Sequence, residues 1–213
     1  MSGGRILALG GASLLASSTD GPLHQYLLDL TGQARPRICY LGTAGGDNVE
    51  YLAAFYAFFA RRAEATHLAL FNRQVDDIEG LLLDQDAIYV GGGNTANMLG
   101  IWPAGAMCWF EAGLTDSFGP GLAPLRDGLK FLKGSFCPHY DSESLRRPRL
   151  HEVIGSGQLP DGYAADDGVG LLFEGRELRE AVASLPGSSA FRVSRGRGNN
   201  VDEEAIRPKV IRG

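Results

Sequence analysis

The chain has little of what marks membrane proteins and exported proteins. Its 213 residues contain no apolar run approaching about 18 residues, the length that a membrane-spanning helix needs. The apolar stretch near the N-terminus is shorter than a signal-peptide core and no small-residue cleavage site follows it. We therefore expect no membrane association and a cytoplasmic location.

Cysteine and histidine are also scarce. The three cysteines form an odd set with no Cys-x-x-Cys pair, which indicates reduced thiols of a cytoplasmic protein rather than a disulfide framework. Four histidines are present, and His151-Glu152 begins like the zinc-protease motif His-Glu-x-x-His. Gly155 occupies the position of the second histidine, so the motif fails. The sequence predicts neither a metal site nor a cofactor.

Basic residues are not in excess. Twenty Lys and Arg stand against 25 Asp and Glu, which gives a net charge of −5 and no expectation of a nucleic-acid partner. Hydrophobic residues make up 44% of the chain, an ordinary share for a globular protein of this length. We expect residues 1–213 to form a single domain.

The first half alternates short apolar runs with helical patterns. This order predicts an α/β fold with a mostly parallel sheet flanked by helices, and places the turns at Gly10, Gly42 and Gly91 at the carboxyl edge where ligands bind. The expected strands are 5–9, 37–43, 66–71 and 87–90, and the expected helices are 23–30, 49–62 and 75–83.

The second half is less regular. We expect an apolar helix ending at 109–113, a Gly/Pro-rich loop at 114–124, a strand at 131–140 and a charged helix at 142–155. Short alternating runs in the last third predict a small antiparallel part. They lie at 163–165, 170–173, 181–183, 190–193 and 209–211.

The glycine loop at 91–95 and the small-residue turn after it carry the clearest functional signal. Consecutive glycines after a strand let backbone N–H groups point at an anion, and an Ala-Gly-Ala turn before a helix is typical of a nucleophile elbow. Pro103 stands where such an elbow carries its nucleophile, and proline has no hydroxyl. Ten residues separate Gly93 from Ala104, enough for a helix but not for a helix and the strand that an elbow requires.

Two further places carry candidate chemistry. His139 follows an apolar run and is either a general base oriented by a carboxylate or a half-buried histidine bound to a carbonyl. The acids at 166 and 167 are either that carboxylate or solvated turn residues. Asp116 either lines the site or caps a turn. The glycine loop lacks the spacing of phosphate-binding motifs, so a nucleotide-binding protein is a weak third alternative.

With these residues the chain resembles the aspartyl dipeptidase (dipeptidase E) and cyanophycinase family of serine peptidases over nearly its whole length. The motifs are Gly-Gly-Gly-Asn-Thr at 91–95, Ala-Gly-Ala at 104–106, Gly-Ser-Phe-Cys-Pro-His-Tyr at 134–140 and Ala-Asp-Asp-Gly at 165–168. The resemblance implies an α/β sandwich similar to class I glutaminases that hydrolyses aspartyl dipeptides without a metal.

Carried over by position, the resemblance makes His139 the base and Asp167 the orienting acid. It implies further roles for backbone or side chains at seven positions. These are the oxyanion hole at Gly92 or Gly93 with Ala104, and substrate binding by Asn94, Asp116 and Arg146 or Arg147. The expected partner is a small peptide substrate that contains aspartate, and a homodimer is left open.

The departures from the family pattern decide our prediction of activity. The family elbow reads Ser-Ala-Gly-Ala, and about twenty or more residues forming a helix and a strand precede it. Here Pro103 replaces the serine, the interval is short, and the acid is Asp rather than the commoner Glu. We predict a serine peptidase with impaired hydrolysis. The alternative is a non-catalytic peptide-binding or regulatory protein that keeps the pocket.

Overall fold

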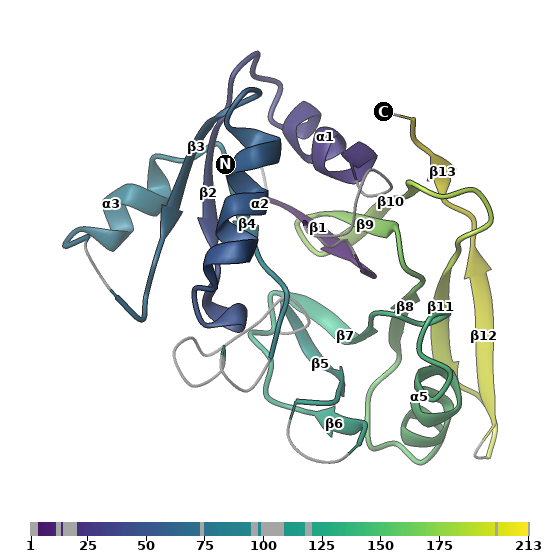
Figure 1. Cartoon of the computed structure of the whole chain (residues 1–213). Helices are drawn as coiled ribbons and strands as arrows, with labels where there is room; N and C mark the ends of the chain where they lie inside the picture. Colours follow the sequence, from purple (N-terminus) through teal and green to yellow (C-terminus); the bar gives the residue numbers. More distant parts are fainter. Residues whose placement is uncertain are drawn as a thin grey trace. The chain divides into compact units, whose positions relative to one another are not determined.

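The computed structural model describes residues 4–11, 14, 21–72, 75–94, 98, 109–117, 121–198 and 200–212 (Figure 1). The chain divides into two compact units, Ser13–Ala106 and Met107–Gly213 together with Met1–Ala12. Each unit is described by itself, and the expectation of one domain over 1–213 stays a prediction. No helix in the described ranges is long and apolar enough to cross a membrane.

The unit Ser13–Ala106 is built on a parallel sheet of three strands in the order β3-β2-β4. Its helices and strands alternate along the chain, as the sequence predicts. The elements are α1 (Gly21–Leu30), β2 (Arg37–Leu41), the 3-10 helix η1 (Thr43–Gly45), α2 (Val49–Phe59), β3 (Glu64–Leu68), α3 (Ile78–Leu83) and β4 (Ala87–Val90).

Helices cover both faces of this sheet. Phe55 and Phe59 of α2 and Leu28 of α1 pack with Tyr40 and Tyr89 on one face. On the other face α3 packs against a cluster formed by Cys39, Leu41 and Leu68. Buried aromatic and aliphatic side chains on both faces are the main stabilising contribution to such a unit.

The two helices that follow β2 and β3 begin at side-chain caps. The Asn48 carboxamide accepts hydrogen bonds from the backbone N–H groups of Glu50 and Tyr51 at the start of α2. The Asp77 carboxylate accepts one from Gly80 at the start of α3. These caps satisfy N–H groups that have no partner inside the helix, which fixes where each helix begins.

The other unit contains two sheets. The six-stranded sheet has the order β12-β11-β8-β7-β5-β6, and the four-stranded sheet has the order β1-β9-β10-β13. The elements are β1 (Arg5–Leu9), β5 (Phe110–Thr115), β6 (Ala123–Leu125), β7 (Leu132–Cys137), α5 (Arg146–Gly155), β8 (Gly162–Ala165), β9 (Val169–Glu174), β10 (Glu177–Ala183), β11 (Ala190–Arg195), β12 (Val201–Ile206) and β13 (Lys209–Val210).

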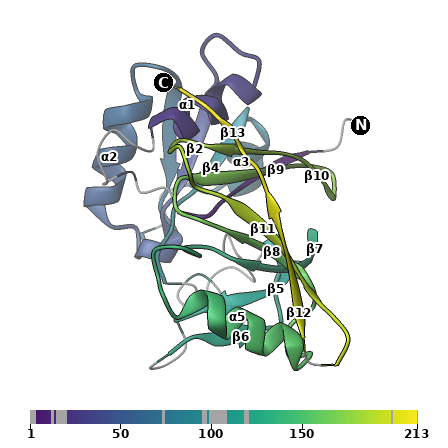
Figure 2. The same cartoon turned by 90° about the vertical axis from the view of Figure 1, so that its right-hand side faces the viewer.

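Each face of the six-stranded sheet is covered. Buried residues of α5, Leu150, Val153 and Ile154, recur at helical spacing and pack on one face, beside β11 and β12 (Figure 2). On the other face the rings of Phe110 and Phe136 stack at 5.1 Å between centroids, and Phe173 of β9 meets Phe110 edge-on at 5.6 Å. Aromatic contacts thus join the two sheets of this unit.

The structure corrects three expectations. Residues 110–113, expected to end a helix, belong to strand β5, which pairs in parallel with β7. The first strand, expected in the parallel sheet, is β1, which pairs antiparallel with β9. The expected loop at 114–124 contains the end of β5 and most of β6. In each case long-range strand pairing outweighs the local pattern.

The expected antiparallel part in the last third holds for most of its pairs. β8, β11 and β12 pair antiparallel in turn, as do β9 and β10. Two pairs differ, since β8 also pairs in parallel with β7 and β13 in parallel with β10. The α/β class is confirmed, with parallel strands at the centre of both units' main sheets.

Candidate catalytic site

Candidate residues of the second half gather at the carboxyl ends of three adjacent strands. Asp116 directly follows β5, His139 follows β7 by two residues, and Asp167 follows β8 by two residues. The strands β5, β7 and β8 are neighbours and parallel, so their carboxyl ends meet at one edge of the sheet. That edge is where open α/β sheets bind ligands.

His139 is held in an unusual backbone conformation. Pro138 lacks the N–H that would continue the β7 ladder, and His139 follows it with φ of 55°, in the left-handed region. The His139 N–H donates to the carbonyl of Gly10 at 2.7 Å, and its carbonyl accepts from Glu143 at 3.2 Å. Two backbone hydrogen bonds therefore fix the loop that presents the imidazole.

The structure brings His139 and Asp167 together. The His139 Nδ1 atom lies 2.6 Å from Oδ1 of Asp167, a hydrogen bond in which a protonated Nδ1 donates to the carboxylate. Both side chains are about 40% exposed, at 40% for His139 and 41% for Asp167. The carboxylate thereby fixes the ring and directs its Nε2 away from the pair, as a general base requires.

Asp166, the neighbouring acid, has a different role in the turn. Its Oδ2 accepts from the Ser189 N–H at 2.8 Å, and burial raises the pKa of this carboxyl, although the Ser189 N–H opposes the shift. Asp167 stays at the surface because Asp141 Oδ1 accepts its N–H at 2.9 Å and Gly168 turns the chain with φ of 73°. Within this turn the Asp166 side chain is therefore buried, whereas the Asp167 side chain contacts His139.

Gly10 and Gly11, which follow β1, shape the site, although the sequence predicted only a turn here. A Cβ on Gly11 would overlap the Asp167 carboxylate and would lie 2.9 Å from Cε1 of His139. A Cβ on Gly10 would overlap the carbonyls of Ala165 and Asp166. Glycine is needed at both positions because the backbone itself packs against the turn. The consecutive glycines after an apolar strand were the available signal.

The two candidate arginines at the start of α5 differ in their surroundings. Arg146 is buried, and its guanidinium donates to Glu143 at 2.7 Å and to the carbonyl of Leu114 at 3.2 Å. Its Nη2 also lies 3.8 Å from the exposed carboxylate of Asp116. These contacts tie α5 to β5, so Arg146 has a structural role. Substrate binding by Arg146 or Asp116 stays a prediction.

Arg147 is half exposed and lies over two aromatic rings. Its guanidinium carbon is 5.3 Å from the centroid of Tyr140 and 5.0 Å from that of Phe191, and it forms an ion pair with Glu203. Glu203 Oε2 also accepts from the Tyr140 hydroxyl at 2.6 Å and lies 2.8 Å from His151 Nε2. Burial opposes the shift, but these hydrogen bonds lower the pKa of Glu203.

This network was missed from the sequence. Tyr140 immediately follows His139, so the contacts of Glu203 on β12 hold the residue next to the candidate base. Asp202, Glu203 and Glu204 are acidic and Ala205 is exposed, so four of the six residues of β12 do not contribute to a buried apolar run. A search of the sequence for such runs therefore misses this strand. Its sequence, Val-Asp-Glu-Glu-Ala-Ile, does not alternate apolar and polar residues, so no local signal indicated the strand.

The glycine loop belongs to the unit Ser13–Ala106. Gly93 has φ of 143°, and a Cβ there would collide with the backbone of Ala44 and Gly45. The Asn94 N–H donates to the Ala44 carbonyl at 2.9 Å. In the part of the chain that the structure describes, no hydrogen bond is formed by the N–H of Gly92 or Gly93. An oxyanion hole at these groups stays a prediction.

The elbow positions Pro103 and Ala104 lie outside the described residues. Among the described side chains near His139, the thiol of Cys137 is fully buried, and burial raises its pKa to about 12 although Arg146 opposes the shift. It is therefore a poor nucleophile. Within the described ranges, no three His, Cys, Asp or Glu side chains are arranged to hold a metal ion.

Comparisons with known proteins agree on one family. The family model of Peptidase family S51 matches residues 6–103 and 101–181. The uncharacterized peptidase YgaJ of Bacillus subtilis (strain 168) is 42% identical over 212 residues, covering 89% of this chain and 91% of that protein. The crystal structure of a peptidase from an acI-B1 Actinobacterium superposes with a TM-score of 0.65 at 14% identity, covering 97% of this chain and 95% of that one. The chain belongs to peptidase family S51.

Proposed function

We propose that this protein is a serine-type dipeptidase by descent, specific for Asp-Xaa dipeptides, whose hydrolysis is impaired because the nucleophile is missing. The observation that carries the proposal is the 2.6 Å hydrogen bond between His139 and Asp167 in a chain that has Pro103 at the nucleophile position. A base with its orienting acid activates a hydroxyl, and proline offers none.

The comparisons support the loss of a segment before the elbow. The two stretches that match the family model meet at residues 101–103, immediately at Pro103. The match to YgaJ spans 212 positions, whereas 89% of this 213-residue chain is about 190 residues, so about 20 positions of the relative have no partner here. That number suits the helix and strand that the short interval lacks.

Hydrolysis of Asp-Xaa dipeptides tests the proposal directly. We expect the purified protein to release product no faster than its His139→Ala variant. Binding and oxyanion stabilisation without a nucleophile leave only a small residual rate. Turnover that disappears both in His139→Ala and after treatment with a serine-directed phosphonate would refute the impairment.

A variant in which the missing segment before the elbow is restored tests the same proposal by gain of activity. In this variant a designed segment with the helix, the strand and the elbow serine that the family pattern implies replaces residues 94–103. We expect this variant to hydrolyse Asp-Xaa dipeptides, and a second substitution, His139→Ala or Asp167→Ala, to remove that activity. The matched control carries the same segment with alanine in place of the serine. An inactive variant that folds would count against a retained dipeptidase site.

A peptide-binding protein without catalysis is the second candidate. The observation that favours it is the same pair, because His139 and Asp167 remain hydrogen-bonded and exposed although the chain lacks the nucleophile. Aspartate-containing dipeptides would then raise the melting temperature without product formation. Dipeptides that leave the melting temperature unchanged would exclude this role.

A further inference from the structure

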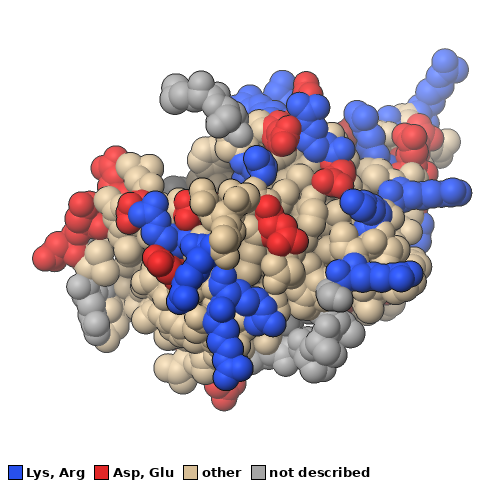
Figure 3. All heavy atoms as spheres, turned by 90° about the horizontal axis from the view of Figure 1, so that it is seen from above, with Lys and Arg blue, Asp and Glu red and all other residues tan. Residues whose placement is uncertain are grey.

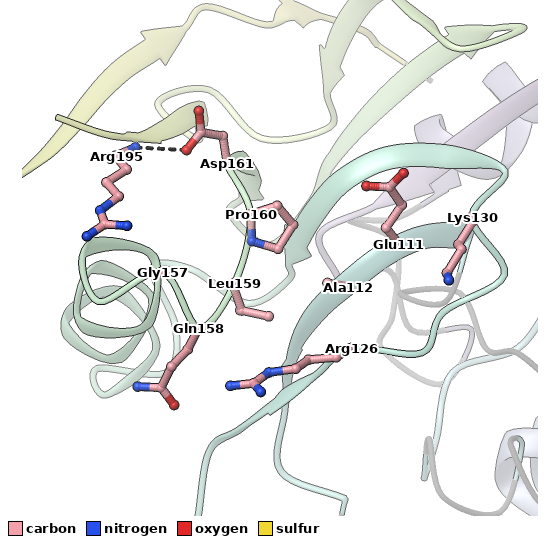
Figure 4. A pocket seen from close by; sticks show the side chains of 10 residues that line it. All are labelled: Glu111, Ala112, Arg126, Lys130, Gly157, Gln158, Leu159, Pro160, Asp161 and Arg195. Atoms are coloured by element: carbon pink, nitrogen blue, oxygen red, sulfur yellow. Dashed lines mark hydrogen bonds between the residues drawn. The ribbon is translucent and has the colours of Figure 1, made fainter.

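A hollow lies at the opposite end of β7 from His139. It has a volume of about 600 Å³, within the range of small-molecule pockets. Its lining comes from the amino ends of β5 and β8, the connection between β6 and β7, and the turn after α5 (Figure 4). The six residues of β7, about 20 Å of strand, separate it from the loop of His139.

Basic side chains predominate in this pocket. Arg126, Lys130 and Arg195 line it, and none of the three forms an ion pair with a described residue. The pocket also contains the carboxylates of Glu111 and Asp161. Each already accepts a backbone N–H, Glu111 from Gly134 at 3.2 Å and Asp161 from Arg195 at 2.8 Å. These bonds orient the two carboxylates but leave them charged, so the lining carries three basic and two acidic side chains.

The guanidinium groups are placed on different walls. The Arg126 side chain extends toward the carboxamide of Gln158, whereas the Arg195 guanidinium lies beside the turn at Gly157 (Figure 4). A Cβ on Gly157 would lie 2.8 Å from Nη1 of Arg195, and Gly157 has φ of 74°. Glycine thus makes room for the guanidinium at the rim, and only glycine adopts this turn without strain.

An apolar floor lies between the cations. Leu159 and Ala112 are both 3% exposed, and Pro160 continues the same wall. The floor is held rigidly, because the Ser135 hydroxyl of β7 donates to the Pro160 carbonyl at 2.7 Å. A small apolar body can therefore be buried here while its charged group faces the rim.

The excess of positive charge is local. The chain has a net charge of −5, and side chains of both signs are mixed on the face shown in Figure 3. Against this background a hollow with three basic and two acidic side chains has a small excess of positive charge, which favours an anion over a cation. Arginine presents two parallel N–H groups, which fit the oxygens of a carboxylate or a phosphate.

We propose that this pocket binds a small organic anion, a carboxylate or phosphate group on a short apolar body, at a site separate from His139 and Asp167. Arg126 and Arg195 hold the anionic oxygens, the Gln158 carboxamide donates a further hydrogen bond, and Leu159 with Pro160 packs against the body. Lys130 adds charge at the other side of the entrance.

Titration with inorganic phosphate and with succinate, followed by backbone amide NMR at constant ionic strength, tests the proposal on the full chain. We expect saturable shifts at Gly157, Gln158, Asp161 and Arg195 with at least one of the two probes. The probe that binds more tightly identifies the anionic group. Arg126→Gln and Arg195→Gln each weaken binding about tenfold, as expected for one charge-assisted contact.

Arg207→Gln is the matched control. Arg207 is exposed and lies outside the pocket, and its substitution removes the same charge as Arg126→Gln or Arg195→Gln. It leaves the affinity unchanged if the site is built as proposed. Binding that weakens equally in this variant, or shifts spread over the basic surface, would show a nonspecific charge effect and overturn the proposal. Absence of saturable shifts with both probes in the folded protein would overturn it as well.

Discussion

Gly11 lies so close to Asp167 that the turn after β1 has no room for a side chain beside the carboxylate. The Gly11 carbonyl also accepts the Gly168 N–H at 2.9 Å, so the two turns are joined at this point. The position of the candidate acid is thereby set by a residue more than 150 positions away in the sequence. The first prediction tests this dependence.

Gly11→Ala is expected to separate His139 from Asp167 and to destabilise the unit by about 1–3 kcal/mol, because an extra methyl group in a tight site forces its neighbours apart. Imidazole ¹⁵N shifts report which ring nitrogen carries the proton and hence the loss of the Nδ1 contact. Gly4→Ala is the control, since nothing lies within 4 Å of a Cβ there. Equal effects of both substitutions would contradict the role of Gly11.

Glu203→Gln is expected to lower the free energy of unfolding at pH 7 by about 1–2 kcal/mol, because Arg147, His151 and Tyr140 lose a charged partner. The pKa of Glu203 is lowered from its usual 4.5, so its stabilisation is present above pH 4.5 and is lost as the pH falls through the lower, folded-state pKa.

The deficit of Glu203→Gln should therefore narrow in acid, which urea unfolding between pH 3 and pH 7 measures. Glu204→Gln is the matched control on the same strand, since Glu204 is exposed. A deficit that is independent of pH would show that the variant acts through packing rather than through charge.

Much of the first half could be predicted because three of its strands, β1, β2 and β4, are followed by glycine and two of its helices, α2 and α3, begin at capping residues. The expected strand at 87–90 matches β4, and the expected helix at 23–30 lies within α1. The strand β5 could not be found this way, since Phe110–Thr115 contains alanine and glycine and owes its conformation to pairing with β6 and β7.

The site was only partly visible in the sequence. His139 could be placed at a strand end from local pattern, but its pairing with Asp167 rather than Asp166 came from the family resemblance. The spacing of the two acids cannot decide between them, because the choice depends on contacts with Ser189 and Asp141. The network around Glu203 joins residues more than 50 positions apart, which no local pattern indicates.

Cys39 and Cys137 are expected to resist iodoacetamide in the native protein at pH 8. Both are fully buried, and burial raises their pKa values to about 11 and about 12. A thiol that is neither ionised nor accessible does not react. Peptide mapping after labelling measures each site, and labelling in guanidinium chloride is the control. Rapid native labelling of Cys137 would instead provide a thiol nucleophile two residues from His139.

Asp166→Asn is expected to leave the protein as stable at pH 7 or more stable, because the carboxamide oxygen can still accept the Ser189 N–H without a buried charge. Burial raises the pKa of Asp166 above its usual 3.8, despite the opposing Ser189 hydrogen bond. The protonated acid is therefore favoured by folding, and this contribution is present below pH 3.8 and lost as the pH rises through the folded-state pKa.

The advantage of Asp166→Asn over the wild type should consequently be largest near pH 7 and should shrink as the pH falls toward 3.8. Thermal unfolding at a series of pH values measures it. Asp127→Asn serves as the control, because Asp127 is exposed and the substitution changes the net charge equally. If the stability of Asp166→Asn relative to the wild type instead increased in acid, the ionised Asp166 would stabilise the turn. Asp166 would then be a second negative charge next to Asp167.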